Sequence, residues 1–307
     1  MTVNEVSARE YANIFPGNTV YNTSAFTVLN SCKCDNAHFL IFRDSKARLG
    51  LILGEKNSVL LSPFSAPFGG FSTIKQQSLT VYLDAIDALK EYISGRKTII
   101  TLPPYFYDAD NIAKTAYSLE AAGAERRTVI NYHFSTDRHN SAEEALSPDQ
   151  KRNYRIATAS GNYSFQHLAS KNPTHIERVY DIISKNRSEK GYYLAMTLND
   201  VMETVKIVPS DLFIVQNDGI DIASALVYRV TDKVAQVIYW GDLAQYAGKH
   251  PMTILTTGIF NYYKNAGLAI VDAGPAGNFD ELNQGLCAFK ERIGCTASVK
   301  YQYIITS

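Results

Sequence analysis

The sequence predicts a mixed α/β protein in which one series of elements occurs twice. Short apolar runs of strand length alternate with amphipathic stretches of helical period along most of the chain. Both halves give the same order, which is three strands, a helix, a strand, a helix and a strand. A largely helical stretch, 146–208, separates the two series. We therefore expect a mixed sheet with crossover connections in two units, 1–145 and 146–307, the second preceded by the helical segment.

The first series is read from its spacing and its turn residues. Its three strands form an expected antiparallel meander, and two helices and two further strands follow. The strands are His38–Asp44, Leu49–Glu55, Val59–Phe64, Thr98–Leu102 and Arg127–Phe134, and the helices are Leu79–Ile93 and Asn111–Ala122. Apolar residues three and four positions apart define the first of these helices, which stops before Gly95.

An irregular loop, Ser62–Phe71, joins the third strand to the first helix. It contains two prolines and two adjacent glycines. Loops of this kind often line sites, because glycine lets backbone approach a ligand. Phe68, Gly69 and Gly70 are therefore candidate substrate-binding residues. The alternative is a plain connection between a strand and a helix.

The middle of the chain begins with a polar stretch, 135–144, that we expect to be a linker. Ser147 and Pro148 then open a helix with an N-cap serine and a proline at the first helical position. Further helices are expected near 174–185 and 197–207, with a basic, tyrosine-containing loop, 185–193, between them.

A basic stripe lies on the helix that begins at Pro148. Lys151, Arg152 and Arg155 fall within about 100° of one another on the helical wheel. Such a stripe is either a solvated face or a site for phosphate groups. Both interpretations stay open at this point.

The second series repeats the element order of the first. Asn217-Asp218-Gly219 is a strong hairpin signal between its first two strands. Its expected elements are strands Leu212–Gln216, Ile222–Val230, Val234–Trp240 and Leu268–Asp272, a helix from Pro251 to the residues before Gly267, and the final helix and strand within Phe279–Ile305. Tyr239 and Trp240 end the third strand and either line an acceptor cleft or pack in the core. Asp272 ends the fourth strand as a candidate base or orienting group, or as a turn-forming aspartate.

The final stretch carries the candidate that matters most. Leu282, Leu286, Phe289 and Ile293 recur at helical spacing, and Gly294 stands where a C-cap glycine belongs. Val299, Tyr301 and Tyr303 then alternate as in a half-buried strand. Lys290 lies at the edge of the apolar stripe, roughly 80° from Leu282 at about 100° per residue. It is either a surface lysine that buries its stem or a residue whose ammonium reaches a site.

Composition narrows the function classes. The 307 residues carry no net charge, with 30 basic and 30 acidic side chains, which argues against a generally basic DNA-binding protein. No apolar run is long enough to span a membrane, and the first residues do not resemble a signal peptide. The four cysteines lack zinc-ligand spacing, so we expect no metal site and read them as free thiols of a cytoplasmic protein.

The element order resembles that of the acyl-CoA N-acyltransferase (GNAT) fold, and two tandem copies with a helical insertion resemble the FemAB family. The run Gly285-Leu286-Cys287-Ala288-Phe289-Lys290, with Gly294 after it, carries the sharpest resemblance. His250-Pro251 before a helix, the strand ending in Asp272 and the Ser62–Phe71 loop also resemble the family.

The resemblance implies transfer of an acyl or aminoacyl group onto an amine. The donor would be acyl-CoA or aminoacyl-tRNA, with no other cofactor, and the acceptor a small or nucleotide-linked molecule, as in peptidoglycan-precursor synthesis for the cell envelope. It implies a catalytic role for Lys290 in holding a phosphate or stabilising an oxyanion. Asp272, as a candidate base or orienting group at a strand end, is the second catalytic candidate.

Two alternatives remain. The pyrophosphate loop of acetyl-CoA-dependent GNAT enzymes, at a helix N-terminus, is not matched by 242–249, which have a different glycine spacing. A binding protein that keeps the fold without catalysis is the first alternative. A plain acetyl-CoA-dependent N-acetyltransferase is the second. No Gly-x-Ser-x-Gly motif supports covalent catalysis.

Overall fold

The computed structural model describes residues 1–159 and 161–306, and these fall into two compact units. Unit 1 comprises 1–130, 278–281 and 298–307, and unit 2 comprises 131–277 and 282–297. The sequence placed the boundary at 145, whereas the structure assigns 131–145 to unit 2. The reason is the path of two strands, described below. No helix among the described residues has the length and apolar character needed to cross a membrane.

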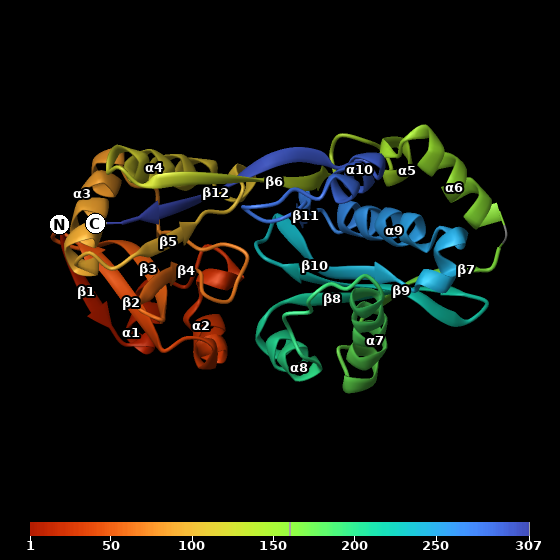
Figure 1. Cartoon of the computed structure of the whole chain (residues 1–307), viewed down its shortest axis with the longest axis horizontal. Helices are drawn as coiled ribbons and strands as arrows, with labels where there is room; N and C mark the ends of the chain where they lie inside the picture. Colours follow the sequence, from red (N-terminus) through yellow and green to blue (C-terminus); the bar gives the residue numbers. More distant parts are fainter. Residues whose placement is uncertain (160, 307) are drawn as a thin grey trace. The chain divides into compact units, whose positions relative to one another are not determined.

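Unit 1 is a sheet with helices on both faces (Figure 1). Its strands lie in the order β1-β2-β3-β4-β5-β12. The strands are β1 (Thr2–Val6), β2 (Asn36–Arg43), β3 (Ala47–Lys56), β4 (Val59–Ser62), β5 (Thr98–Thr101) and the C-terminal β12 (Thr296–Ile305), and the helices are α1 (Ala8–Ile14), α2 (Ser24–Asn30), α3 (Leu79–Ile93) and α4 (Ala109–Ala121), with short 3-10 turns at Val20–Asn22, Ser31–Lys33 and Tyr105–Tyr107.

Alternation along β2 explains why both faces of this sheet are covered. Leu40 and Phe42 point into the core beneath α3 and α4, whereas Phe39 and Ile41 pack against Tyr11 of α1. The meander of β2, β3 and β4 and the helix at Leu79–Ile93 are confirmed. The sequence did not predict β1, α1 or α2.

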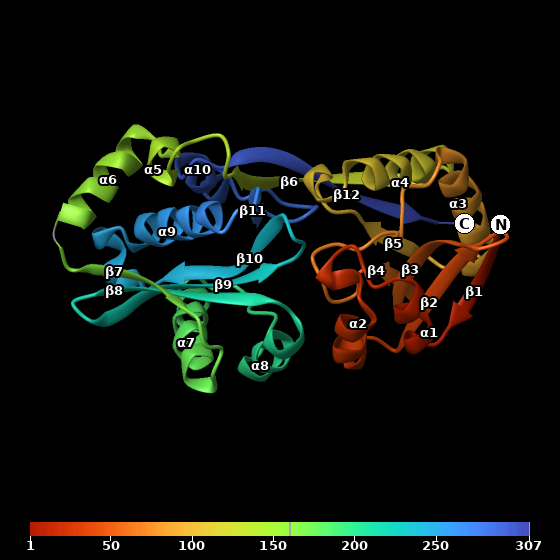
Figure 2. The ribbon, with the colours of Figure 1, turned by 180° about the vertical axis from the view of Figure 1, so that it is seen from behind.

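Unit 2 repeats this plan with strand order β6-β11-β10-β9-β8-β7. α9 covers one face of β8, β9 and β10, and α7 covers the other, as Figure 2 shows from behind. The strands are β6 (Glu125–Ser135), β7 (Tyr163–Leu168), β8 (Ser210–Asn217), β9 (Ile220–Arg229), β10 (Val234–Asp242) and β11 (Ile270–Pro275), and the helices are α5 (Ala142–Ala145), α6 (Pro148–Ala159), α7 (Pro173–Glu189), α8 (Leu198–Ile207), α9 (Pro251–Asn265) and α10 (Gln284–Arg292), with a 3-10 turn at Ala244–Lys249.

The two halves of the sequence exchange their last strands. β12 follows α10 but pairs antiparallel with β5, where Tyr303 lies opposite Ile100 and is fully buried. β6 follows α4, yet its end pairs antiparallel with β11, with His133 opposite Asp272. The sequence gives the element order correctly, but each strand completes the sheet of the other half. This exchange moves the boundary from 145 to 130.

Local details of the final stretch differ from the expected pattern. α10 begins at Gln284 with Asn283 as its N-cap, so Leu282 precedes the helix and is exposed. Gly294 has φ +89°, as expected of a C-cap glycine. In β12 the buried side chains include Ser298 and Lys300, whereas Val299 is exposed.

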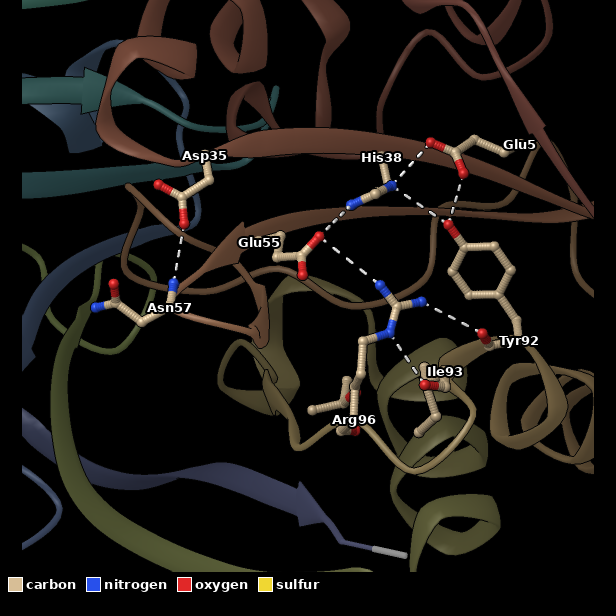
Figure 3. A network of polar contacts seen from close by, with 9 residues as sticks. Glu5, Asp35, His38, Glu55, Asn57, Tyr92, Ile93 and Arg96 are labelled. Atoms are coloured by element: carbon tan, nitrogen blue, oxygen red, sulfur yellow. Dashed lines mark hydrogen bonds and ion pairs between the residues drawn. The ribbon is translucent and has the colours of Figure 1, made fainter.

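A polar network fixes the free edge of unit 1, where β1 pairs with β2 (Figure 3). His38 Nδ1 lies 2.8 Å from Glu5 Oε1, and its Nε2 lies 3.3 Å from Glu55 Oε2. The Tyr92 hydroxyl donates to Glu5 Oε2 at 2.7 Å, and Arg96 lies 3.7 Å from Glu55. The network therefore joins β1, β2 and β3 to α3.

Glu5 makes this edge acid-sensitive. Partial burial raises the pKa of its carboxyl, but hydrogen bonds from Tyr92 and His38 outweigh burial and lower the pKa below 4.5. A carboxyl whose pKa is lower in the folded state stabilises the fold at pH values above its pKa in the unfolded chain. This stabilisation is lost as the pH falls through the folded-state pKa. We predict that Glu5→Gln lowers the free energy of unfolding by up to about 1 kcal/mol at pH 7, since the side chain is half exposed.

Urea denaturation at pH 7 and at pH 3 measures this effect. The difference between wild type and Glu5→Gln shrinks at the lower pH. Glu125→Gln, at an exposed position of β6, is the control and shows no such change. An equal difference at both pH values contradicts the assigned role of Glu5.

Candidate functional site

Unit 2 contains a pocket of about 660 Å³ at the ends of two neighbouring strands. It is lined by residues of α7, β10, β11 and α10, and by the start of α9. The residues are Asn186, Arg187, Lys190, Tyr192, Val237, Ile238, Trp240, Gly241, Met252, Ala273, Gly274, Pro275, Gly277, Asn283, Gly285, Leu286, Phe289 and Lys290. This volume suits a small ligand or part of a larger one.

The pocket exists because β10 and β11 separate. The two strands pair in parallel from Val234–Ile270 only as far as Gln236–Asp272. Beyond that point β10 pairs with β9 alone and β11 with β6 alone. The crevice beyond the carboxyl ends of parallel strands is the usual place for a ligand in such sheets.

Both strands change register where they separate. β10 shifts between Val237 and Tyr239, so Ile238 is an extra residue relative to β9. β11 shifts between Asp272 and Gly274, so Ala273 is extra relative to β6. Bulges take residues out of the ladder and redirect the chain, and they are common next to active sites. Ile238 and Ala273 both line the pocket.

Asp272 lies beneath the pocket and is completely buried. Its carboxylate accepts hydrogen bonds from Asn131 Nδ2 at 2.9 Å, Gln236 Nε2 at 2.8 Å and the Gly274 amide at 2.9 Å. Three donors compensate for the loss of water around a buried carboxylate. Asp272 thus holds the last paired position of β10 and the bulge of β11.

Lys290 enters the same place from α10. Its Nζ donates to the carbonyl oxygens of Gly274 and Pro275, each at 2.8 Å, and it lies 5.9 Å from the centre of the Tyr132 ring. The side chain is 2% exposed, so it is not the edge lysine that the helical wheel suggested. The wheel missed this because it does not show that the end of β11 lies beside Lys290 and accepts its hydrogen bonds. Lys290 still lines the pocket.

Burial sets the protonation of several neighbouring groups. It raises the pKa of the Cys295 thiol to about 12, against the effect of the Lys290 ammonium. It lowers the pKa of His133, which the Asp272 carboxylate opposes. These groups are therefore neutral near pH 7. Asp242, at the end of β10, has a raised pKa because of burial, although Lys190 opposes the shift.

Asp242 is a candidate that the sequence did not reveal. Its carboxylate accepts from Asn186 Nδ2 at 3.3 Å and lies 3.8 Å from Lys190 Nζ. Both contact residues line the pocket. A raised carboxyl pKa beside a pocket is a common feature of proton-transferring groups. No sequence motif marks this aspartate.

The structure brings two of the predicted site residues together. Trp240 and Lys290 both line the pocket, and the Trp240 ring packs edge-on against Phe289 at 6.0 Å. Tyr239, the neighbour of Trp240, does not line the pocket. Its ring lies 5.5 Å from the Arg187 guanidinium carbon.

Phe68, Gly69 and Gly70 lie in unit 1, where the loop after β4 is folded inward. Phe68 is 1% exposed and packs against Tyr21 and Tyr107, with ring centres 5.1 and 4.6 Å away. The Gly69 amide donates to the Thr101 carbonyl, and the Gly70 amide donates to Ser62 Oγ. The cavity beside Gly69 measures only about 20 Å³.

The basic stripe lies on α6, which packs against α9. Arg152 and Arg155 are exposed and Lys151 is partly exposed, and none of the three lines the pocket. The cations that do line it with Lys290 are Arg187 and Lys190. The sequence placed these two in a loop, but α7 continues through Glu189, so Arg187 lies on the helix and Lys190 is its C-cap residue. The clustering of basic residues and tyrosines in that stretch was the available signal.

The described residues contain no group of three or more His, Cys, Asp and Glu side chains that could hold a metal ion. The sequence matches no protein-family model and no curated protein.

Solved structures match along almost the whole chain. FemX superposes with a TM-score of 0.68 at 11% identity, covering 99% of this chain and 98% of that one. L-PGS from Bacillus licheniformis gives 0.61 at 13% identity, covering 96% and 90%. A tandem GNAT protein from the clavulanic acid biosynthesis pathway gives 0.54 at 11% identity, covering 99% and 98%. The chain has a FemAB-like tandem GNAT fold. In this tandem GNAT chain, the open pocket belongs to the second GNAT unit.

The contacts of Asp272 predict that a conservative substitution of this residue strongly destabilises the fold. Asp272→Asn keeps the shape but replaces one acceptor oxygen with an amide that faces donors. We expect the free energy of unfolding to fall by about 2–4 kcal/mol, because buried donors lose their acceptor.

Urea denaturation measures this change, with Asp232→Asn as the matched control at an exposed turn position. We expect the control to stay within about 0.5 kcal/mol of wild type. Equal stability of the two variants refutes the assigned role of Asp272.

Proposed function

We propose that the chain is an acyl- or aminoacyltransferase that moves its group onto an amine, and that the reaction occurs in the unit 2 pocket. The observation that carries the proposal is the open pocket between the separated ends of β10 and β11. It lies within a fold shared along the whole chain with FemX. The predicted residues Trp240 and Lys290 both line it.

The pocket offers what amine acylation requires. An amine attacks the carbonyl carbon of an ester or thioester, negative charge develops on the carbonyl oxygen, and the acyl–oxygen or acyl–sulfur bond then breaks. Positioning, stabilisation of the oxyanion and a route for the amine proton suffice. A covalent enzyme intermediate is not needed.

Two groups are candidates for stabilising the oxyanion. We propose that the amide of Ile238 donates to it, since Ile238 is the extra residue of a bulge and lines the pocket. The Lys290 ammonium, which also lines the pocket, supplies positive charge. Its bonds to the Gly274 and Pro275 carbonyls hold that charge in place.

The two aspartates take different roles. Asp272 lies beneath the pocket with three donors on its carboxylate, so we assign it to positioning rather than to contact with the substrate. Asp242 is our candidate for accepting the amine proton, directly or through a water molecule. Its raised pKa brings it closer to neutral pH, where proton acceptance is most effective.

The finer assignments rest on the family resemblance. We propose acyl-CoA or aminoacyl-tRNA as donor, a small or nucleotide-linked amine as acceptor, and a cytoplasmic role in forming cell-envelope precursors. The roles of Lys151, Arg152, Arg155, Phe68, Gly69, Gly70 and Tyr239 in binding substrate stay predictions.

A binding protein without catalysis is the second candidate. It is favoured by one observation: Lys290 and Asp272, the predicted catalytic pair, both bond to backbone of the same short segment of β11. Calorimetric titration of the full chain with acetyl-CoA, charged tRNA and nucleotide sugars, followed by a transfer assay with the donor that binds, separates the candidates. Binding without transfer identifies a binding protein, and failure of every donor to bind refutes the enzyme.

Replacement of Lys290 tests its role in turnover. With the donor that binds, we predict that Lys290→Met lowers kcat by about 100-fold, the loss that typically follows removal of one oxyanion-stabilising group. The donor KM changes far less. Steady-state kinetics measure both quantities.

Lys264→Met is the matched control. Lys264 Nζ also donates to a backbone carbonyl, that of Thr136 at 2.7 Å, but it does not line the pocket. This control keeps wild-type kcat. If both variants lose kcat equally, the effect is structural, and if Lys290→Met retains kcat, Lys290 has no part in the mechanism.

A further inference from the structure

Arg187 is held in an unusual way at the edge of the unit 2 pocket. Its guanidinium carbon lies 5.8 Å from the centre of the Tyr192 ring and 5.5 Å from that of Tyr239. Contact with aromatic rings restricts a guanidinium more firmly than solvent does, and it leaves the N–H groups available for hydrogen bonds. The rings come from β10 and from the segment after α7, so both sides are built into unit 2.

The hydrogen-bonding capacity of this guanidinium is not used within the described part of the chain. Arg187 Nε is shielded from solvent and has no hydrogen-bond partner there. No ion pair involves Arg187 among the described residues either. By contrast Arg178, which lies earlier on the same helix, makes two bonds to Asp221 at 2.9 and 3.0 Å. A shielded N–H without an acceptor is costly, and a ligand that supplies an acceptor removes that cost.

The charge around Arg187 is positive. Lys190 follows it by three residues, which places both on one side of α7, and both line the pocket. Lys290 lines the same pocket, and no Asp or Glu is among the described lining residues. The carboxylate closest to Lys190, that of Asp242, lies 3.8 Å away, so it is a loose ion pair.

We propose that Arg187 and Lys190 form a phosphate-binding subsite of the pocket. A planar guanidinium binds two oxygens of one phosphate side by side, and a nearby ammonium adds a point charge. Two adjacent cations in a pocket that no described Asp or Glu lines suit a doubly charged phosphate or a pyrophosphate better than a single carboxylate. Trp240, Phe289 and Leu286 then receive the less polar part of the ligand.

The inference deepens the proposed function, because it assigns the phosphate-bearing part of donor or acceptor to that same pocket. It also relocates phosphate recognition from α6 to α7. On α6 the cations Arg152 and Arg155 are exposed and do not line the pocket, so water competes with a ligand at both positions. On α7 the guanidinium is partly desolvated, which strengthens its attraction for an anion.

The Tyr192 hydroxyl makes a further contact, with the start of α10. Asn283 Nδ2, on the N-cap residue of α10, donates to the Tyr192 hydroxyl at 3.4 Å. The ring that restrains Arg187 therefore also touches the helix that carries Lys290. We assign Tyr192 to positioning of Arg187 rather than to ligand contact.

Calorimetric titration of the full-length chain with inorganic pyrophosphate tests the proposal. We expect Arg187→Met to weaken binding at least 10-fold, and Arg187→Lys to weaken it less, since charge remains but the fork is lost. Lys190→Met weakens it several-fold. Tyr192→Phe binds like wild type because the ring remains, whereas Tyr192→Leu binds more weakly. Lys185→Met, at an exposed position of α7 that does not line the pocket, is the control and leaves the affinity unchanged. Arg152→Met tests the alternative site on α6.

Each contrary outcome has a definite meaning. If wild type, Arg187→Lys and Arg187→Met all bind pyrophosphate with equal affinity, the subsite is refuted. A folding defect cannot explain that result, because it would not leave the affinity intact. Loss of binding by Arg152→Met alone places phosphate on α6 and overturns the proposal. Succinate that binds as tightly as pyrophosphate, with the same dependence on Arg187, overturns the choice of phosphate over carboxylate.

Circular dichroism and thermal melting of each variant separate misfolding from loss of the subsite. The proposed function fails separately. If pyrophosphate binding depends on Arg187 but no donor supports acyl transfer, the phosphate subsite is supported and the proposed transferase activity is refuted. If the chain catalyses acyl transfer but does not bind pyrophosphate, the proposed transferase activity is supported and the phosphate subsite is refuted.

Discussion

The unit 2 site depends on two opposite charges that hold the same short segment of β11. Asp272 accepts the Gly274 amide, and Lys290 donates to the Gly274 and Pro275 carbonyls. Burying either ion costs several kcal/mol unless its hydrogen bonds are satisfied, so the segment has to keep the conformation that satisfies both. Gly274 meets this demand with φ +78°, a conformation that other residues adopt only with strain. The same carboxylate bonds Gln236 at the last paired position of β10, so one polar cluster fixes where the two strands separate and the pocket begins.

The element order of the fold was predictable, but its strand partners were not. Hydrophobic period identifies a helix such as Leu79–Ile93, because it reports which face is buried. It also located the strand Thr296–Ile305, although Val299 in its predicted buried face is exposed. It does not report what buries that face. β12 pairs with β5 across about two thirds of the length of the sequence, with Tyr303 opposite Ile100. Pairing at that separation is decided by tertiary packing, which local propensity does not encode.

The site was predictable only in part, for related reasons. Trp240 and Lys290 stand out from their places at a strand end and on an amphipathic helix, and the structure places both in the pocket. The burial of Lys290 depends on its contacts with the end of β11, which no helical wheel describes. Arg187 depends on two tyrosines, one of them on β10, and so its environment exists only after folding. A basic stripe such as that on α6 is visible in the sequence because it is regular, but regular spacing on an exposed face is also what solvation alone produces.

The two units have the same fold but differ in the space beside their parallel strands, so the pocket is more informative about function than the fold. In unit 1 the parallel pair β4 and β5 has the same place in the element order as β10 and β11. There the following loop turns inward, its amides bond to Thr101 and Ser62, and Phe68 fills the space as a core residue. In unit 2 the corresponding segment runs on through Trp240 and Gly241, and the crevice stays open. Two units of the same fold thus differ in whether a ligand can enter between their parallel strands. A fold-level likeness cannot make that distinction, since it scores both units alike. Within unit 2 the distinction depends on side chains. A buried acid and a buried lysine bond to the end of β11 where the strands separate, and an arginine lies against two tyrosine rings at the edge of the pocket.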